Sequence, residues 1–213
     1  MASLFKRFKK KLPSVTAKSS AYYTRENIIL NMADLLRILN GAPELKEFKT
    51  DKELTFNNIP LLEINQAILK RNFDKPAYVL SRSAHIPGHK VVFYKDSVLH
   101  FKFLIQYHFI NDQFFFACNR LSSHAVLSDS NKKSIINRIS KKYLGEENSS
   151  DIKPVIKVVD PNGSIIYTID DVYFYMYYLP QNETKELLIK KYTDYTDEDI
   201  KPQGFTDTLE KYI

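Results

Sequence analysis

Histidine is the residue type in this chain whose spacing comes closest to that of a metal site. His85 and His89 are four residues apart, which would place two ligands on one face of a helix. The proline and glycine between them exclude that helix. A loop could still bring both rings to one ion with His124 as a third ligand, although no Glu–His or Cys–His pairing supports it. We therefore interpret the segment first as a polar loop and predict no metal ligand.

Other catalytic motifs are absent from the sequence. The five glycines lie too far apart for a phosphate-binding loop or a dinucleotide fingerprint, and there is no G-x-S-x-G motif. The single cysteine, Cys118, falls on the inner face of a predicted meander, where a thiol packs as a small hydrophobe. Asp170 and Asp171 lie between two predicted strands, a place that favours aspartate for turn geometry alone. The sequence therefore predicts no catalytic residue and no cofactor.

The strongest local pattern is the basic segment LFKRFKKKL near the N-terminus. On a helix, its apolar side chains fall on one side and its basic side chains largely on the other, as in helices that lie on anionic membranes. A basic arm can also bind an acidic groove on a protein partner or this protein's own acidic C-terminus, contact nucleic-acid phosphates, or have no specific role. The predicted anchoring residues are Leu4, Phe5, Lys6, Arg7, Phe8, Lys9, Lys10, Lys11 and Leu12.

Aromatic residues give the second pattern. The chain has 14 Tyr and 14 Phe but no Trp, and five of these rings fall in the segment VYFYMYYL at 172–179. One face of such a strand must meet the core, and tyrosine on an exposed face is favoured at protein interfaces. The predicted partner-binding residues are Tyr173, Tyr175 and Tyr177. The alternative is a central strand that a helix covers on each side.

The charge distribution divides the chain into three segments. The formal net charge is +6, but residues 1–18 hold six basic residues and no acid. The remaining 25 basic residues match the 25 acidic residues of the rest of the chain, and residues 194–213 carry a net charge of −4. We predict a basic amphipathic arm and linker over 1–18, a single folded domain over 19–193 and an acidic segment over 194–213. Nucleic acid is therefore the less favoured partner.

Three features that the sequence lacks indicate the cellular compartment of the protein. No apolar stretch approaches the roughly 18 residues that a membrane-spanning helix needs, and the N-terminus lacks the apolar region of a signal peptide. A single cysteine excludes an internal disulfide and fits a reducing compartment. We expect a cytoplasmic protein, with peripheral association at a membrane if the basic arm meets lipid.

Hydrophobic periodicity predicts four helices and seven strands. One helix is capped by Thr24 and ended by Gly41, and a second spans 60–72. A third spans 129–144 with Ser128 or Ser130 as its cap, and a fourth starts near Asn182. Strands are predicted at 77–82, 90–95, 98–110, 113–121, 155–159, 164–169 and 172–179. The strands at 155–159 and 164–169 flank an Asp-Pro-Asn-Gly turn, with Gly163 in the left-handed position. Runs of strands with interposed helices indicate an α+β fold. The expected sheet is a three- to four-stranded antiparallel meander plus a second three-stranded unit, flanked by helices.

Two short turns fix the predicted register of the meander. Asn111-Asp112 and Asp96-Ser97 are each taken as a two-residue hairpin loop, and both turns then place the same apolar residues on one inner face. The opposite face is mixed, with His100, Gln106 and His108 among apolar residues. The predicted inner-face pairs are Phe109 with Phe114, Tyr107 with Phe116, Ile105 with Cys118, Tyr94 with Leu99 and Val92 with Phe101.

Taken together, these patterns favour a non-catalytic protein-binding or adaptor module, chaperone-like or structural, whose basic N-terminal arm adds an anchor. Its partner would be a protein, bound by the aromatic sheet, with an anionic membrane surface as a further contact of the arm. Two alternatives remain. One is a hydrolase-type enzyme with a histidine–carboxylate site near residues 85–89, and the other is a nucleic-acid-associated protein bound through the arm.

Overall fold

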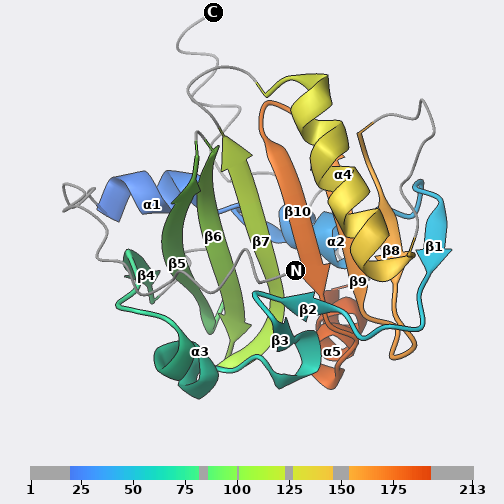
Figure 1. The fold of residues 1–213 in the computed structure, drawn as a ribbon. Helices are drawn as coiled ribbons and strands as arrows, with labels where there is room; N and C mark the ends of the chain where they lie inside the picture. Colours follow the sequence, from blue (N-terminus) through green and yellow to red (C-terminus); the bar gives the residue numbers. More distant parts are fainter. Residues whose placement is uncertain (1–19, 82–85, 100, 123–126, 146–153, 193–213) are drawn as a thin grey trace, which may run out of the picture.

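One eight-stranded sheet organises the protein (Figure 1). The computed structural model describes residues 20–81, 86–99, 101–122, 127–145 and 154–192. The strand order is β1-β8-β9-β10-β7-β6-β5-β4, and every neighbouring pair is antiparallel except β1 and β8. The strands are β1 (Glu47–Lys49), β4 (Tyr78–Leu80), β5 (His89–Val98), β6 (Phe101–Ile110), β7 (Gln113–Ser122), β8 (Lys157–Val159), β9 (Ile165–Asp170) and β10 (Phe174–Leu179).

The predicted α+β class with an antiparallel sheet is confirmed. The predicted meander corresponds to β4–β7 and the predicted second unit to β8–β10, and β7 pairs with β10 to join them into one sheet. Three strands were not predicted: β1, and the separate hairpin of β2 (Thr55–Phe56) and β3 (Ile59–Pro60). Each has only two or three residues, which is too short for a period of two to be visible in the sequence.

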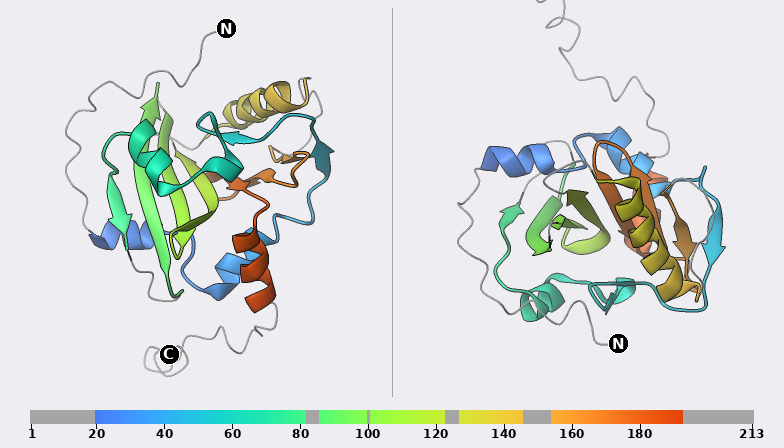
Figure 2. Two further views of the ribbon diagram at one scale, coloured as in Figure 1. Left: turned by 90° about the horizontal axis from the view of Figure 1, so that it is seen from below. Right: turned by 45° about the horizontal axis from the view of Figure 1, so that its top comes forward.

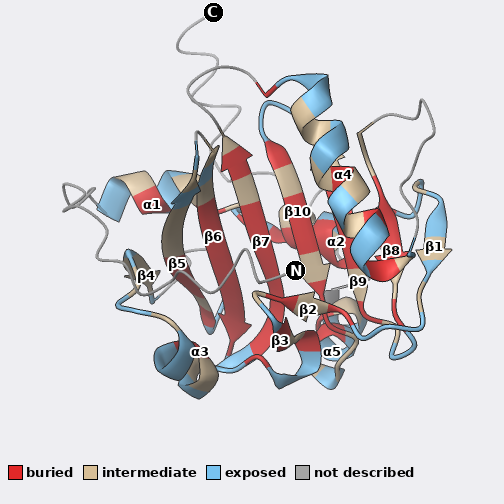
Figure 3. Ribbon diagram, in the orientation of Figure 1, coloured by how far each residue is buried: buried red, intermediate tan, exposed pale blue. Residues whose placement is uncertain are grey.

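Helices cover both faces of the sheet (Figure 2). One face carries α4 (Asp129–Tyr143), the β2–β3 hairpin, the 3-10 helix η1 (Leu61–Glu63) and α3 (Gln66–Asn72). The other face carries α1 (Ser20–Glu26), α2 (Met32–Leu39) and α5 (Glu183–Tyr192). The two long strands β6 and β7 at the middle of the sheet are therefore mostly buried, while the outer sides of the helices are exposed (Figure 3).

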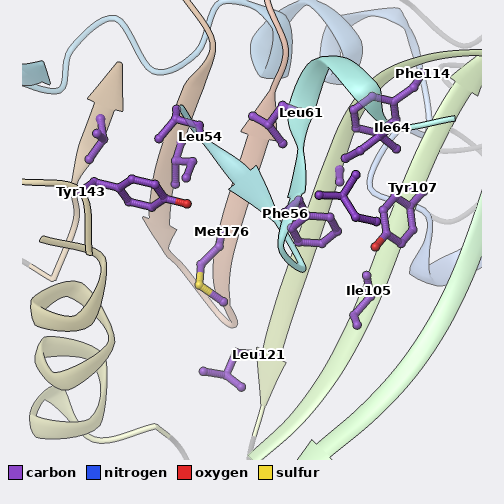
Figure 4. Packing of buried hydrophobic residues seen from close by; sticks show 14 of the residues in the cluster. Leu54, Phe56, Leu61, Ile64, Ile105, Tyr107, Phe114, Leu121, Tyr143 and Met176 are labelled. Carbon is purple, nitrogen blue, oxygen red and sulfur yellow. The ribbon is translucent and has the colours of Figure 1, made fainter. Parts of the chain in front are cut away.

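A cluster of buried apolar side chains fills the space between the sheet and the α4 side (Figure 4). Tyr107 lies at its centre, with its ring 5.0 Å from that of Phe56, and its hydroxyl accepts a hydrogen bond of 2.9 Å from Asn57 Nδ2. The hydroxyl of Tyr143 donates to the carbonyl of Thr55 at 3.2 Å. These polar contacts fix the β2–β3 hairpin against both the sheet and α4.

The first predicted helix is in fact two helices. Instead of capping a helix, Thr24 lies within α1 and its hydroxyl donates to the carbonyl of Ser20. The buried side chain of Asn27 then accepts from the N–H of Ile29 and donates to its carbonyl, which stabilises a non-helical turn. Asn31 caps α2, accepting from the N–H of Asp34 at 2.9 Å. The apolar spacing across 28–39 was real, but two asparagines break the helix.

The second predicted helix is also interrupted, whereas the third is confirmed. Residues 60–72 contain η1 and α3, and Asn65 caps α3 by accepting from the N–H of Ile68 at 3.0 Å. Ser128 caps α4, as one of the two predicted caps. Asparagine again marks the break, because its side chain competes with the backbone for hydrogen bonds.

The predicted register of β6 and β7 is right at the turn and wrong beyond it. Asn111 and Asp112 both have positive φ and form the two-residue loop, so that Phe109 faces Phe114. The register then shifts, His108 faces Phe116, and Phe115 is left as the extra residue of a bulge. A one-residue shift reverses the faces of the rest of β7. Cys118 therefore pairs with Gln106 and lies on the face covered by α2, not with Ile105 as predicted.

The other predicted turn is misplaced. Asp96 and Ser97 remain in β5, and the strand continues to Val98, which pairs with Phe101 of β6. The predicted pairs of Tyr94 and Val92 are therefore wrong: Tyr94 faces Ile105 and Val92 faces Tyr107. The observed partners are displaced along β6 by an even number of residues from the predicted ones. Alternate residues of a strand share a face, so the Tyr94 and Val92 side chains still contact the predicted inner core.

Gly88 offers a test of how tightly the β6–β7 turn packs against the start of β5. Its φ is +73°, its carbonyl accepts from the N–H of Asn111 at 3.1 Å, and a Cβ at this position would collide with the Asn111 side chain. We expect Gly88→Ala to lower the free energy of unfolding by about 2–3 kcal/mol, from backbone strain and overpacking together.

Gly145 provides the matched control for this substitution. Its φ is +79°, but no atom lies within 4 Å of the added Cβ, so Gly145→Ala should cost only the strain, about 1 kcal/mol. Urea denaturation of both variants measures the two losses. Equal losses would show that the turn does not pack as described.

Candidate functional site

Tyr175 and Tyr177 of β10, and Tyr173 just before this strand, lie on one face of the sheet. Strand alternation directs Tyr173, Tyr175 and Tyr177 toward the α2 side, and the residues between them belong to the opposite cluster. The ring centroids of Tyr173 and Tyr175 are 6.3 Å apart, and those of Tyr175 and Tyr177 are 6.0 Å apart. The predicted partner face is thus a continuous ladder of three rings.

Helix α2 covers only one end of this ladder. Tyr177 is 4% exposed and stacks on Tyr167 at 4.7 Å, and the hydroxyl of Tyr167 donates to the carbonyl of Ile38 in α2. Tyr175 is half-buried, and Tyr173 is 38% exposed. The alternative of a strand covered on both faces therefore describes the Tyr177 end, while the Tyr173 end is open.

A pocket of about 430 Å³ lies at the end of the tyrosine ladder that α2 does not cover. Its volume is within the range of sites that hold a small ligand or several side chains of a partner. The three tyrosines form one wall, and the chain that connects α1 to α2 forms another. Six charged residues line it: Arg25, Arg37, Arg120, Glu26, Asp34 and Asp171. The remaining lining residues are Asn27, Ile28, Leu30 and Ile169.

Arg120 of β7 connects the two walls. It is paired across the ladder with Tyr175, its guanidinium lies 4.3 Å from the centroid of the Tyr173 ring, and it forms an ion pair with Glu26 at the end of α1. The Arg120 and Glu26 side chains are only 13% and 16% exposed. A guanidinium over an aromatic face is attractive and more so when water is excluded. Arg120 therefore holds both the tyrosine ladder and the α1 terminus in place.

A buried glutamine fixes the chain that connects α1 to α2. Gln106 of β6 donates to the carbonyl of Glu26 at 2.8 Å, and its side-chain oxygen accepts from the N–H of Ile28 at 3.4 Å. Asp34 accepts from the N–H of Leu30 at 3.0 Å. Backbone groups that would otherwise lack partners are thus satisfied, and the connection is held as a rigid wall.

The hydroxyls of Tyr175 and Tyr177 are neutral near pH 7. Burial raises the pKa of Tyr175, an effect that the positive charge of Arg120 partly offsets. Burial also raises the pKa of Tyr177. Both hydroxyls can therefore donate hydrogen bonds to a ligand, but neither would act as a base.

Three exposed apolar residues lie in the pocket lining or next to it in the chain, and we call them the rim residues: Leu30, Val172 and Tyr173. Leu30 and Tyr173, both in the pocket lining, are 49% and 38% exposed, and Val172, next to Tyr173 in the chain, is 84% exposed. Apolar residues around a polar pocket are the composition expected of an interaction site. The other exposed large apolar residues of the described chain are Leu62, Leu99 and Leu187.

The histidines give a different result from the predicted polar loop. His89 is not in a loop but at the start of β5, fully buried, and its Nε2 lies 3.0 Å from Nδ1 of His108 on β6. Phe115 and Phe116 flank the pair, with the Phe116 ring stacked 4.0 Å from His108. His85 and His124 lie outside the described residues.

This histidine pair is a core feature with little chemistry to offer. Burial lowers the pKa of His89 to about 4, and burial together with His89 lowers the pKa of His108 well below its usual value. Within the described residues, no group of three or more His, Cys, Asp and Glu side chains could hold a metal ion. His89 thus contacts another histidine rather than a carboxylate, an arrangement that does not favour a hydrolase site here.

The predicted anchoring arm, Leu4–Leu12, and the acidic segment 194–213 lie outside the described residues. Among the helices that the structure describes, none is both long and apolar enough to cross a membrane. Cys118 is buried, and burial raises the pKa of its thiol. A buried neutral thiol is a packing residue rather than a nucleophile.

Sequence reasoning found the tyrosines but missed Arg120 and Glu26. Without the bulge at Phe115, Arg120 would share the inner face with Phe114, where a charge has no partner. Its position in an otherwise apolar strand was the signal, because a lone arginine in such a strand needs a counter-charge or an aromatic face. The partner Glu26 lies 94 residues away in the chain, beyond the reach of local patterns.

Comparison with known proteins found no family model, no curated protein and no solved structure that matches this chain.

Proposed function

We propose that this protein is a non-catalytic binding module that engages a protein partner at the pocket between β10 and the α1–α2 connection. The observation that carries the proposal is the arginine–tyrosine pocket itself, open at Tyr173 and lined by the exposed Leu30, with the exposed Val172 next to Tyr173 in the chain. Tyrosine and arginine are the residues that most often dominate binding energy at protein interfaces. A rigid, partly desolvated pocket also limits the entropy lost on binding.

Replacing the rim tests this proposal. The triple variant Leu30→Ser, Val172→Ser and Tyr173→Ser removes three exposed side chains and should leave the buried core intact. The matched control carries Leu62→Ser, Leu99→Ser and Leu187→Ser, which are exposed elsewhere. Each tagged full-length protein is isolated from the cells that produce it, and the proteins that accompany it are quantified by mass spectrometry.

A partner of the pocket should accompany the wild type and the control but fall at least tenfold with the rim variant, as expected when an interface loses about 1.4 kcal/mol or more. If every accompanying protein is retained by the rim variant, the pocket is not the binding site and the proposal fails.

We also propose that the basic arm adds a membrane contact to this module, since it combines an apolar side with five basic residues within Leu4–Leu12. The full-length protein should sediment with anionic vesicles and not with neutral ones. A chain starting at Ser19 should lose this binding, and added duplex DNA should not compete. Equal sedimentation of both chains, or displacement by DNA, would contradict a membrane role for the arm.

A further inference from the structure

We infer that the pocket receives an acidic side chain of the partner, carried next to an apolar residue. The inference rests on the function proposed above and names the chemistry of the segment that would enter the pocket. It follows from the balance of hydrogen-bond donors and acceptors among the lining side chains.

The pocket has unused donors. Arg25 is exposed and forms no hydrogen bond or ion pair within the described part of the chain, although a guanidinium offers five N–H groups. Among the described residues, Arg37 has one charged partner, Asp34 Oδ1 at 3.6 Å, which is longer than a hydrogen bond. The Nε of Arg120 is buried and has no hydrogen-bond partner in the described part of the chain. The hydroxyls of Tyr173, Tyr175 and Tyr177 also line the pocket, and each can donate or accept, so they do not change the balance.

Most acceptors of the pocket already face a donor or a cation. Glu26 Oε2 forms the ion pair with Arg120, although it accepts no hydrogen bond within the described residues. Asp34 accepts from the N–H of Leu30 through Oδ2, and its Oδ1 faces Arg37 at 3.6 Å. The amide of Asn27 is occupied on both sides by Ile29. Only Asp171, in the turn between β9 and β10, has a carboxylate without a partner in the described chain.

Formal charge alone would not reveal this preference, because three arginines balance three acids. The hydrogen-bonding groups do reveal a preference for an acid, because the unpaired N–H groups of the arginines outnumber the unpaired carboxylate oxygens in the described part of the chain. A carboxylate is an acceptor-only group and binds a guanidinium by two parallel hydrogen bonds. It would therefore use the donors that the folded chain leaves over, whereas an ammonium group would find little beyond Asp171.

The apolar part of the ligand follows from the rim. Three apolar residues line the pocket together with the tyrosine rings: Leu30, Ile28 and Ile169. A leucine or phenylalanine next to the acid would bury its side chain against these groups and exclude water from the ion pair. The segment we assign to the pocket is thus an acidic residue adjacent to an apolar one.

Three rhodamine-labelled octapeptides test the inference, with the sequence Gly-Ser-Leu-X-Phe-X-Ser-Gly and X as Glu, Gln or Lys. Binding to the full-length protein is measured by fluorescence anisotropy. The Glu peptide should bind about tenfold or more tightly than the Gln peptide, because it alone forms charge-assisted hydrogen bonds with the arginines. The Lys peptide should bind no better than the Gln peptide.

Two exposed arginines of the pocket are then replaced. The variant Arg25→Gln with Arg37→Gln should weaken binding of the Glu peptide about tenfold and leave the Gln peptide unchanged. The control variant Arg71→Gln with Arg138→Gln removes the same charge from exposed positions on α3 and α4 and should bind like the wild type.

Equal binding of the Glu and Gln peptides, preference for Lys, loss of Glu-peptide binding in the control variant, or no binding at all would overturn the inference. So would a single-stranded oligonucleotide that binds more tightly than the Glu peptide through the same two arginines. These results would not by themselves contradict the proposed function. If the rim variant still loses a partner, the pocket binds a protein segment of different chemistry. If the rim variant loses none, both proposals fail.

Discussion

Lowering the pH from 7 to 5 should reduce the free energy of unfolding by about 3–4 kcal/mol, because His89 and His108 are buried as a neutral pair. Burial holds the pKa of His89 at about 4, and the pKa of His108 is also well below its usual value. In the unfolded chain both return to about 6.5. At pH values between the folded-state and unfolded-state pKa values, the unfolded state binds more protons than the folded state. The free energy of unfolding therefore falls as the pH falls.

The geometry of the pair explains why protonation is so unfavourable. The two rings share one hydrogen bond of 3.0 Å. Whichever ring donates, Nδ1 of His89 and Nε2 of His108 remain buried without a partner among the residues that the structure describes. The neighbouring side chains are phenylalanines, which cannot stabilise a cation in this edge-on and stacked environment as an acid would. Each added proton therefore places a charge in an apolar layer.

Urea denaturation across pH 5–7 measures the effect, and phenylalanine variants assign it. His108→Phe should remove about half of the pH dependence, and the double variant with His89→Phe nearly all of it. The double variant should also match or exceed the wild type in stability at pH 7, since it removes two unsatisfied polar atoms. A wild-type stability that is flat between pH 7 and pH 5, or an unchanged slope in His108→Phe, would contradict the neutral pair.

Breaking the ion pair between Glu26 and Arg120 should be the most damaging change at the pocket. Arg120→Met leaves the nearly buried Glu26 carboxylate without its partner and removes the cation from the Tyr173 ring. We expect a loss of about 2–3 kcal/mol, below the cost of breaking a fully buried pair, because both side chains keep some contact with water.

A double-mutant cycle separates this pair from the general effects of each substitution. Glu26→Gln and Arg120→Met should show a coupling of about 1–2 kcal/mol. The same cycle on Asp34 and Arg37 is the control, because that contact is 3.6 Å long with Arg37 65% exposed, and should couple by less than about 0.5 kcal/mol. Equal coupling in the two cycles would mean that Arg120 does not hold the pocket walls together.

The sequence predicted the parts of the fold that depend on local chemistry. The turn at Asn111 and Asp112, the cap at Ser128 and the Gly163 turn all follow from side-chain and backbone preferences of a few residues, and the structure confirms them. The tyrosine face was predictable for the same reason, because alternation along one strand needs no knowledge of its neighbours.

The errors arose where a distant group decides the local structure. The bulge at Phe115 cannot be seen in the sequence, because the apolar run around it fits either register. The break of the first helix at Asn27 and Asn31 is supported by Gln106, a residue of the sheet that donates to the carbonyl of Glu26. The assignment of His89 to a loop failed because its partner His108 comes from the neighbouring strand. Each of these interactions is set by tertiary packing.

The pocket is formed by residues that a local sequence pattern predicts and by residues that only tertiary packing brings together. Tyr173, Tyr175 and Tyr177 come from a visible local pattern, whereas Arg120 and the α1–α2 connection come from folding. A protein that only needed a stable core could have covered the whole tyrosine ladder with α2. The proposed binding function rests on this open Tyr173 and on the arginine donors beside it that are unpaired within the described residues.

Crosslinking from the rim tests the central claim most directly. A photoreactive amino acid is placed at Val172, which is 84% exposed and next to the lining residue Tyr173 in the chain, or at Leu187, which is 65% exposed on α5, in the full-length protein within its own cells. We predict a discrete crosslinked product from position 172 that is absent from position 187 and is lost when Arg25 and Arg37 are replaced by glutamine. The same products from both positions, or none from position 172, would contradict a binding site at the pocket.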